Sequence, residues 1–464
     1  MTLPRTIGQL RESGYNDRSV KTEMRHNLIE KLRRNETIFP GIVGYEDSVI
    51  PQIESAVLSG HDLVLLGERG QAKTRIARSL INLLDEAIPI IAGCEINDSP
   101  FHPICAVCRE KIEADGDDVE IAWIPRDRRY GEKLATPDIT IADLIGEVDP
   151  IKVAEGRYLS DELTIHYGLV PRTNRGVFCI NELPDLGERI QVGLLNIMEE
   201  RDVQIRGYKI RLSLDLYVVA CANPEDYTNR GRIITPLKDR FGSQVRTHYP
   251  RTIEHEIDVM EQERTVFADE GFQTVVPGFM KEVVAEATHL ARRNPDVSQR
   301  SGVSARVSIC NYENLVSSAL RRAIRLNERQ VVPRVGDLIA MVPSTQGKIE
   351  LETVGDTKED RVVEKIVQGA VLNIFNRHLS VSEFEPLIAR FEHGLTVEIG
   401  EGMPSERYVR LVSELPELRS AATRLKADSS PAMIASAVEF ILEGLHLNRK
   451  LNKERTAGKS RYRR

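Results

Sequence analysis

Short apolar runs alternate with helical patterns along the first half of the chain. Five runs are typical of buried strands: residues 63–66, 88–92, 177–180, 216–220 and 244–248. Between most of them, apolar residues recur at intervals of three and four positions, which indicates amphipathic helices. This alternation predicts an α/β fold with a five-stranded parallel sheet and helices on both of its faces.

The second half of the chain has a different pattern. Residues 252–327 are helical throughout and predict a small lid, and a mostly helical extension follows. The last residues are basic and contain glycine and serine, so they are expected to be disordered. The predicted organisation is a polar, partly helical segment at 1–36, an α/β domain at 37–250, a helical lid at 251–330, an extension at 331–447 and a tail at 448–464.

A glycine-containing turn joins the first predicted strand to the next helix, in LVLLGERGQAKTR at 63–75. Successive backbone N–H groups of such a turn can surround an anion, and the helix N-terminus adds a positive dipole end. The spacing therefore predicts an ATP phosphate loop, in which a lysine neutralises the β- and γ-phosphates and the next hydroxyl binds Mg²⁺. The predicted binding residues are Gly67, Glu68, Arg69, Gly70, Gln71, Ala72, Lys73, Thr74 and Arg75, with Ile42 and Val43 of an earlier turn against the base.

Ala72 departs from the usual pattern, in which a glycine precedes the lysine. Gly67 and Gly70 still allow the backbone to bend tightly. Ala72 can donate its N–H to a phosphate provided that its φ is negative.

Polar residues end two of the later strands. Glu182 is expected to orient and deprotonate the attacking water. Asn181 stands where an acid would hold the water shell of Mg²⁺; it keeps an oxygen but lacks the charge. Thr74 and the phosphates could still hold Mg²⁺, with slower hydrolysis or weaker metal binding as one outcome and compensation by Asp185 or Glu188 as the alternative. Asn223, after the run 216–220, would contact the γ-phosphate and the water.

Two arginines are candidates for contacts with the triphosphate. Arg240 lies in L-x-D-R-F and could reach the γ-phosphate of a neighbouring copy, which requires a ring or another head-to-tail oligomer. The alternative is a local surface pair with Asp239. Arg306, near the start of a lid helix, could contact the same ATP in cis or be a solvated helix arginine.

A cysteine-containing segment, CEINDSPFHPICAVC, offers a candidate zinc site. Cys94, His102, Cys105 and Cys108 are four ligands of the kind that structural Zn²⁺ prefers. The alternative is three cytosolic thiols and a surface histidine without a metal. The other three cysteines fall inside core elements.

The order of these landmarks resembles the AAA+ ATPases. The insert at 139–175 is similar to the helix-2 insert of the magnesium chelatase I subunit and of its MoxR relatives. The alternating segment at 203–212, around Gly207-Tyr208, is similar to the hairpin that precedes the sensor strand in the same clade. The matching pieces of the insert are Gly146–Asp149, Gly156, Gly168–Val170 and Asn174–Gly176.

The resemblance covers about residues 38–327 and has departures. Asn181 replaces the family aspartate. The arginine that often precedes the L-x-D-R-F motif is replaced near Ile234-Thr235, with Arg230 or Arg232 as substitutes. The section after Pro333 matches no part of the family pattern, and the D-x-S-x-S motif of the partner subunit is absent from the sequence.

The resemblance implies an ATP-hydrolysing ring motor, commonly a hexamer, that remodels or gates a partner with a von Willebrand-type metal-binding domain. Insertion of Mg²⁺ into a porphyrin is one version of that function. Three other functions compete. A sigma-54 activator needs a GAFTGA-like loop, which the sequence lacks; a helicase could use Arg206, Lys209 and Arg211 on phosphates; a nucleotide-gated scaffold would bind ATP and hydrolyse it slowly because of Asn181.

Composition narrows the partners and the compartment. The 464 residues allow two or three domains, and a net charge of -7 does not favour nonspecific nucleic-acid binding. The sequence has no apolar run long enough to cross a membrane, and its N-terminus lacks the apolar stretch of a secretory signal. Six cysteines in so long a chain do not suggest a disulfide scaffold, so a cytoplasmic location is expected.

Overall fold

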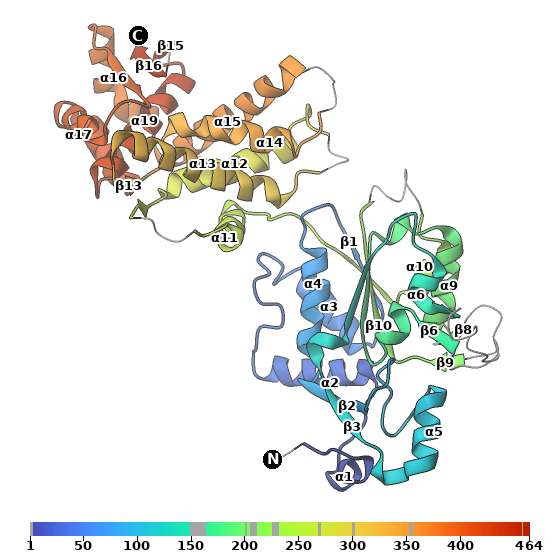
Figure 1. The fold of residues 1–464 in the computed structure, drawn as a ribbon. Helices are drawn as coiled ribbons and strands as arrows, with labels where there is room; N and C mark the ends of the chain where they lie inside the picture. Colours follow the sequence, from blue (N-terminus) through green and yellow to red (C-terminus); the bar gives the residue numbers. More distant parts are fainter. Residues whose placement is uncertain are drawn as a thin grey trace. The chain divides into compact units, whose positions relative to one another are not determined.

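The structure, a computed structural model, describes residues 3–148, 164–199, 202–204, 211–224, 232–267, 271–298, 302–351, 356–456 and 458–464. The chain divides into two compact units, Met1–His248 and Tyr249–Arg464, and each is described by itself (Figure 1). Within the described residues, no helix combines the length and the apolar character that a bilayer crossing requires.

A five-stranded parallel sheet forms the centre of the first unit, in the order β11-β1-β10-β7-β4. This confirms the predicted α/β fold. The carboxyl ends of parallel strands meet at one edge, so residues that follow β1, β7 and β10 come together there. The strands are β1 (Leu63–Leu66), β4 (Tyr130–Leu134), β7 (Gly176–Asn181), β10 (Leu216–Ala222) and β11 (Ser243–Arg246).

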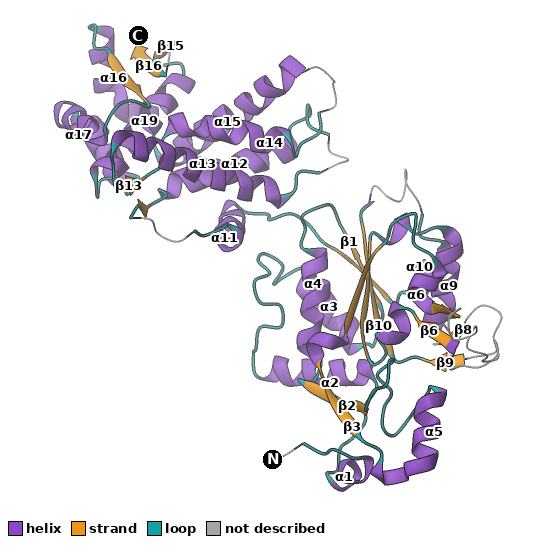
Figure 2. Cartoon of the chain, viewed as in Figure 1, coloured by secondary structure: helices purple, strands orange, loops and turns teal. Residues whose placement is uncertain are grey.

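One of the five predicted strands lies outside the main sheet, so its predicted place in that sheet is wrong. The run at 88–92 forms β2 (Ala87–Ile91), which pairs antiparallel with β3 (Ile121–Pro125) in a separate ladder (Figure 2). The strand that completes the main sheet is β4, with the sequence YGEKL. As the edge strand, β4 has a single neighbour, β7, and is only partly buried, so it needs no continuous apolar run.

Alternate side chains of the central strands enter two hydrophobic clusters, one on each face of the sheet. Leu63 and Leu65 of β1 belong to one cluster, and Val64 and Leu66 belong to the other. Helices cover both faces (Figure 1). The first cluster includes residues of α2 (Val20–Arg33), α3 (Val49–Leu58) and α4 (Lys73–Ser79), and the second includes residues of α9 (Glu188–Glu199) and α10 (Thr235–Arg240).

A buried ion pair and a glycine hold β4 against β7. The Arg129 guanidinium donates to both carboxylate oxygens of Glu23 on α2, at 2.7 and 2.6 Å, and to the Arg175 carbonyl at 2.7 Å. A Cβ at Gly176 would lie 2.1 Å from the Arg129 carbonyl oxygen, so a larger residue cannot fit there. These contacts keep the two strands in a register that pairs Glu132 with Cys179.

The remaining elements of the first unit are small. The segment predicted as a hairpin at 203–212 corresponds to β8 and β9, with Val203 opposite Leu212. Its turn at Gly207-Tyr208 and the side chains of Arg206, Lys209 and Arg211 lie outside the described part of the chain, as do Asp149, Gly156 and Arg230. The small elements of the first unit are α1 (Ile7–Glu12), α5 (Ala106–Asp115), α6 (Ile141–Ile145), β5 (Gly146–Val148), β6 (Ile165–Tyr167), α8 (Leu169–Arg172), β8 (Asp202–Gln204) and β9 (Arg211–Ser213).

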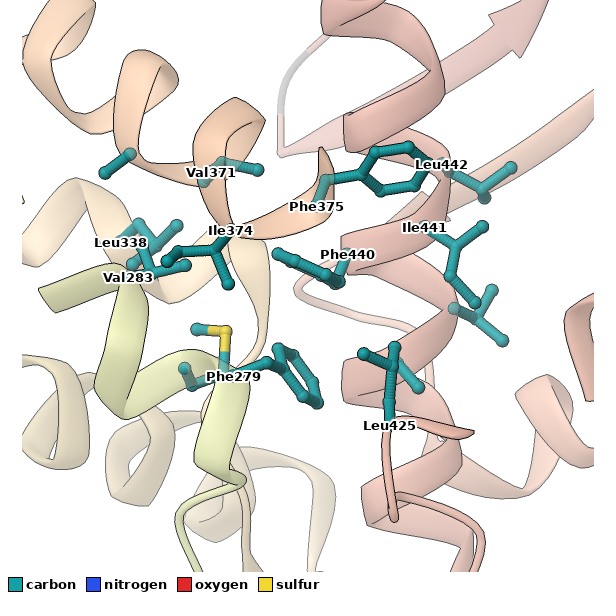
Figure 3. Packing of buried hydrophobic residues seen from close by; sticks show 14 of the residues in the cluster. Phe279, Val283, Leu338, Val371, Ile374, Phe375, Leu425, Phe440, Ile441 and Leu442 are labelled. Carbon is teal, nitrogen blue, oxygen red and sulfur yellow. The ribbon is translucent and has the colours of Figure 1, made fainter. Parts of the chain in front are cut away.

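The second unit has a large hydrophobic core, to which the predicted lid and the predicted extension both contribute. Phe279 and Phe440 pack with ring centroids 4.6 Å apart, and Phe375 lies 6.2 Å from Phe440 (Figure 3). The lid and the extension therefore fold as a single unit. Its helices are α11 (Ile253–Glu263), α12 (Gly278–Arg293), α13 (Ala305–Leu326), α14 (Met341–Gln346), α15 (Asp356–His378), α16 (Glu385–Glu392), α17 (Ser405–Glu414), α18 (Pro416–Arg424) and α19 (Pro431–Leu447).

The prediction that residues 448–464 are disordered is wrong. They form β15 (Asn452–Thr456) and β16 (Lys459–Arg463), which continue an antiparallel sheet with β14 (Val397–Gly400). Tyr462 is buried and its hydroxyl donates to Glu443, while Lys459 pairs with Glu398. Carboxylates of the unit thus balance the basic residues, and the tail contributes a core residue. A short parallel pair, β12 (Gln273–Thr274) and β13 (Gln330–Val331), completes the unit.

Candidate functional site

The loop between β1 and α4 winds through left-handed backbone conformations. Gly70 has φ of 74° and Ala72 has φ of 56°. The condition of a negative φ at Ala72 is therefore not met: the turn into α4 needs the left-handed region here, which is why glycine is usual at this position. An alanine in that region costs roughly 1–2 kcal/mol.

The Lys73 ammonium is buried at the carboxyl edge of the sheet, with 8% of the residue exposed. It donates to the Gly67 carbonyl at 2.5 Å, to the Glu68 carbonyl at 2.8 Å and to Asn223 Oδ1 at 2.7 Å. Neutral oxygens of the loop and of β10 thus orient a buried positive charge in the loop where phosphates are expected.

A hydrogen bond links Asn223 onward to the predicted general base. Asn223 Nδ2 donates to Glu182 Oε2 at 2.8 Å. Glu182 follows β7 with φ of 54°, a conformation that non-glycine residues rarely adopt and that is often found at functional sites. The structure therefore brings Lys73, Asn223 and Glu182 into one hydrogen-bonded chain, although they come from three different elements.

Asn181 lies between the loop and the edge strand. Its Oδ1 accepts from the Thr74 hydroxyl at 3.4 Å, and its Nδ2 donates to Glu132 Oε1 at 2.6 Å. Glu132 also accepts from Arg78 at 2.7 and 3.0 Å, which raises the pKa of Arg78. Sequence reasoning missed Glu132, because β4 was not recognised as a strand of this sheet.

The two carboxylates considered as compensating acids lie after β7. Asp185 is half-buried in the short 3₁₀ turn at Leu183–Asp185, and Glu188 begins α9 with an exposed side chain. Compensation by either stays a prediction. The described carboxylate that accepts from the Asn181 amide is that of Glu132.

Buried polar contacts hold the other side of the loop. Thr247 donates to Gln71 Oε1 at 2.7 Å, and the same oxygen accepts from the Glu68 N–H at 3.0 Å. The Tyr45 hydroxyl lies 3.0 Å from the Gln71 carbonyl, and burial raises its pKa to about 12. Ile42, predicted to contact the base, is buried in the core three residues before Tyr45, and Val43 is half-buried.

A cavity of about 470 Å³ opens beside this loop. Two basic side chains, Lys238 and Arg246, contribute to its wall together with Gly67 and Glu68. The cavity therefore joins the loop to positive charge from α10 and β11, which suits an anionic ligand.

The predicted arginines have different surroundings. Arg240 ends α10 and contacts Asp239 at 3.0 Å, with a third of its side chain exposed, so the local pair considered from the sequence is present. Arg306 is exposed near the start of α13 in the second unit. Their contacts with a nucleotide remain predictions. Arg69 is exposed on the loop, and Arg75 is exposed in the first turn of α4.

A second cluster of ligating side chains lies near the other end of the first unit. The ligand atoms of Cys94, Asp98, Cys105 and Cys108 all lie within 4.8 Å of one another. The structure groups the three predicted cysteines with Asp98, whereas the predicted ligand His102 is exposed on the loop and is not part of this group. Spacing alone favoured the histidine because imidazole is the commoner zinc ligand.

The fold and this arrangement of loop, lysine and strand-end side chains resemble the core of AAA+ proteins. In sequence, the chain is similar to the I subunit of magnesium chelatases. It is 27% identical over 263 residues to a magnesium-chelatase subunit ChlI homolog of Methanocaldococcus jannaschii, covering 55% of this chain and 65% of that protein. It is 24% identical over 253 residues to the chloroplastic ChlI subunit of Nicotiana tabacum, covering 51% and 53%.

These matches confirm the resemblance to AAA+ ATPases of the magnesium chelatase I and MoxR type. The chain spans less than two thirds of the length of these relatives. Among solved structures, it is similar to a magnesium chelatase complex of subunits BchI and BchD, with 21% identity, a TM-score of 0.37 and coverage of 71% of this chain and 98% of that one. No family model matches the chain.

Proposed function

We propose that the first unit binds ATP with Mg²⁺ and hydrolyses it to ADP and phosphate. The observation that carries the proposal is the hydrogen-bonded chain from Lys73 through Asn223 to Glu182. Lys73 neutralises the phosphates, Glu182 accepts a proton from the attacking water, and Asn223 joins the two so that they respond to the same γ-phosphate.

The residues beside the loop fit Mg²⁺. The Thr74 hydroxyl and the Asn181 amide oxygen are hard oxygen donors, and they are hydrogen-bonded to each other beside the loop. When bound, Mg²⁺ neutralises the charge that develops on the phosphate oxygens. The residues of this chain hold the nucleotide and orient the water.

Two substitutions separate binding from chemistry. Lys73→Ala removes the buried positive charge, so we expect ATP binding itself to be lost. Glu182→Gln keeps the size and removes the base, so we expect ATP binding to persist while turnover falls by about 10²–10⁴-fold. Binding is measured with a fluorescent ATP analogue and turnover by phosphate release.

The matched control is Lys111→Ala on α5, where the lysine contacts the Ala92 carbonyl outside this site. Wild-type turnover in both site variants would contradict the assignment. If Lys111→Ala also lost ATP binding, the loss in Lys73→Ala would be explained by misfolding.

We infer that copies of the chain assemble into a ring and remodel or gate a partner with a von Willebrand-type domain. Support comes from the sequence resemblance to magnesium chelatase I subunits and from Arg240 in its L-x-D-R-F motif. Light scattering in the presence of ATP and Mg²⁺ tests the assembly: a mass near six chains is expected, and a monomer at all concentrations would contradict it.

We also propose that the cysteine cluster binds a structural Zn²⁺. Asp98 Oδ2 accepts from the Ile104 and Cys105 N–H groups, at 3.0 and 2.9 Å, whereas its Oδ1 is buried without a hydrogen-bond partner among the described residues. Burying a carboxylate oxygen without a partner costs free energy. A bound metal ion would be that partner, and three thiolates would complete the tetrahedral ligand set that Zn²⁺ prefers.

Backbone donors further suit the cluster to thiolate ligands. The Asp98 N–H donates to Cys94 Sγ at 3.3 Å, and the Cys108 N–H donates to Cys105 Sγ at 3.4 Å. Such donors orient and stabilise metal-bound sulfur.

Elemental analysis of the purified full-length protein tests the zinc proposal. We expect about one zinc per chain, held by four protein ligands, and its loss in Cys108→Ser. Cys310→Ser is the control, because Cys310 lies in the second unit outside the cluster. Metal-free wild-type protein that also fails to take up added Zn²⁺ under reducing conditions would end the proposal.

A further inference from the structure

The Asn181 side chain has a fixed orientation because its two ends meet different partners. A carboxylate only accepts hydrogen bonds, so the amide nitrogen must face Glu132, and it does so at 2.6 Å. The amide oxygen is thereby turned toward the Thr74 hydroxyl, at 3.4 Å. Glu132 therefore determines which atom of Asn181 faces the metal side of the loop.

Glu132 also places a negative charge one hydrogen bond away from Asn181. The side chain of Glu132 is 21% exposed, so water screens this charge less than at the open surface. A neutral asparagine stands where Mg²⁺-dependent nucleotide sites of this kind use an acid. The charge that Asn181 lacks is thus present on the neighbouring strand.

We propose that Glu132 is a positioning residue for Mg²⁺. Its carboxylate orients the Asn181 amide so that the amide oxygen faces the metal, and its negative charge replaces the charge that an acid at position 181 would carry. This inference rests on the proposed nucleotide site and identifies the source of metal affinity within it. The oxygen and the negative charge that one acidic residue usually provides thus lie on two strands, the Asn181 oxygen at the end of β7 and the Glu132 charge on β4.

Arg78 opposes this effect. Its guanidinium contacts both Glu132 oxygens, at 2.7 and 3.0 Å, and neutralises part of the charge, although 63% of its side chain is exposed. If Glu132 acts by its charge, removing Arg78 leaves metal affinity intact or increases it. If Glu132 only serves the ion pair, removing either partner has the same effect.

The test measures Mn²⁺ affinity for the ADP complex of the full-length protein by electron paramagnetic resonance of free Mn²⁺. Glu132→Gln keeps an oxygen that can accept from Asn181 and removes only the charge. We expect it to weaken Mn²⁺ binding by about 10–100-fold, the usual cost of losing an outer partner of a metal ligand. ADP affinity without metal should stay unchanged, which a structural defect would not allow.

Exchanging the two residues provides the decisive arm. In Glu132→Gln/Asn181→Asp the carboxylate moves from β4 to β7, so we expect Mn²⁺ affinity to return to about the wild-type value because the local charge is restored. Arg78→Gln is the matched control and should bind Mn²⁺ at least as tightly as wild type.

The outcomes separate the inference from the function on which it rests. Unchanged Mn²⁺ affinity in Glu132→Gln would overturn the inference, and so would a double variant no better than the single one. An Arg78→Gln variant as weak as Glu132→Gln would overturn it as well. A wild-type protein that binds no ADP in the absence of metal would instead overturn the proposed nucleotide site and the inference with it.

Discussion

Ala72 shows how one residue can be strained where a ligand is expected. Its left-handed backbone, with φ of 56°, is comfortable for glycine and unfavourable for alanine. We predict that Ala72→Gly stabilises the protein by up to about 1 kcal/mol, the strain relieved less the extra freedom of the unfolded chain. ATP binding should be retained, because the loop keeps its shape.

Ala77 in α4 is the control for Ala72, since the same change there meets right-handed helix and buried packing. Ala77→Gly should cost about 1 kcal/mol or more. Urea unfolding measures both free energies. A loss of stability in Ala72→Gly as large as that in Ala77→Gly would show that no strain is stored in the loop.

At the scale of residues, the sequence predicted those candidate site residues that directly follow a recognisable strand and so lie at one edge of the sheet. Lys73, Glu182 and Asn223 each follow a recognisable apolar strand, and the ends of parallel strands meet. Glu132 and Asp98 could not be found in this way. Glu132 lies in a strand that has no apolar run. Asp98 is recognised only from the three-dimensional structure, where its Oδ1 is buried without a hydrogen-bond partner among the described residues.

At the scale of elements, hydrophobic pattern identified strands more reliably than their partners. The run at 88–92 is a strand, as its isoleucines indicate, but it pairs with β3 outside the main sheet. The edge strand β4 is held instead by polar contacts, above all the buried pair of Arg129 and Glu23. Single-chain periodicity does not report such contacts.

The C-terminal strands illustrate the same limit. Basic residues dominate β15 and β16, and composition alone indicates a solvated tail. Their order comes from long-range partners, since Tyr462 reaches Glu443 and Lys453 pairs with the same carboxylate. A charged segment folds when carboxylates elsewhere in the chain balance it and one side chain enters the core.

At the scale of the whole molecule, the account depends on how copies of the chain meet. Arg240 ends α10 close in sequence to β11, the edge strand of the main sheet beside β1. A guanidinium supplied to a neighbour's phosphate stabilises the transition state and is typically worth about 10³–10⁵-fold in rate. Each active site would then be completed by a second copy.

The central claim is that one copy supplies Lys73 and Glu182 while the next supplies Arg240. Mixing Arg240→Ala with Glu182→Gln tests it most directly, with subunit exchange verified by energy transfer between labelled chains. Each variant alone should bind ATP without appreciable turnover. An equal random mixture should regain about a quarter of wild-type ATPase activity, because that share of interfaces joins an intact base to an intact arginine. An exchanged mixture that stays inactive, or an Arg240→Ala protein that is fully active alone, would contradict the claim.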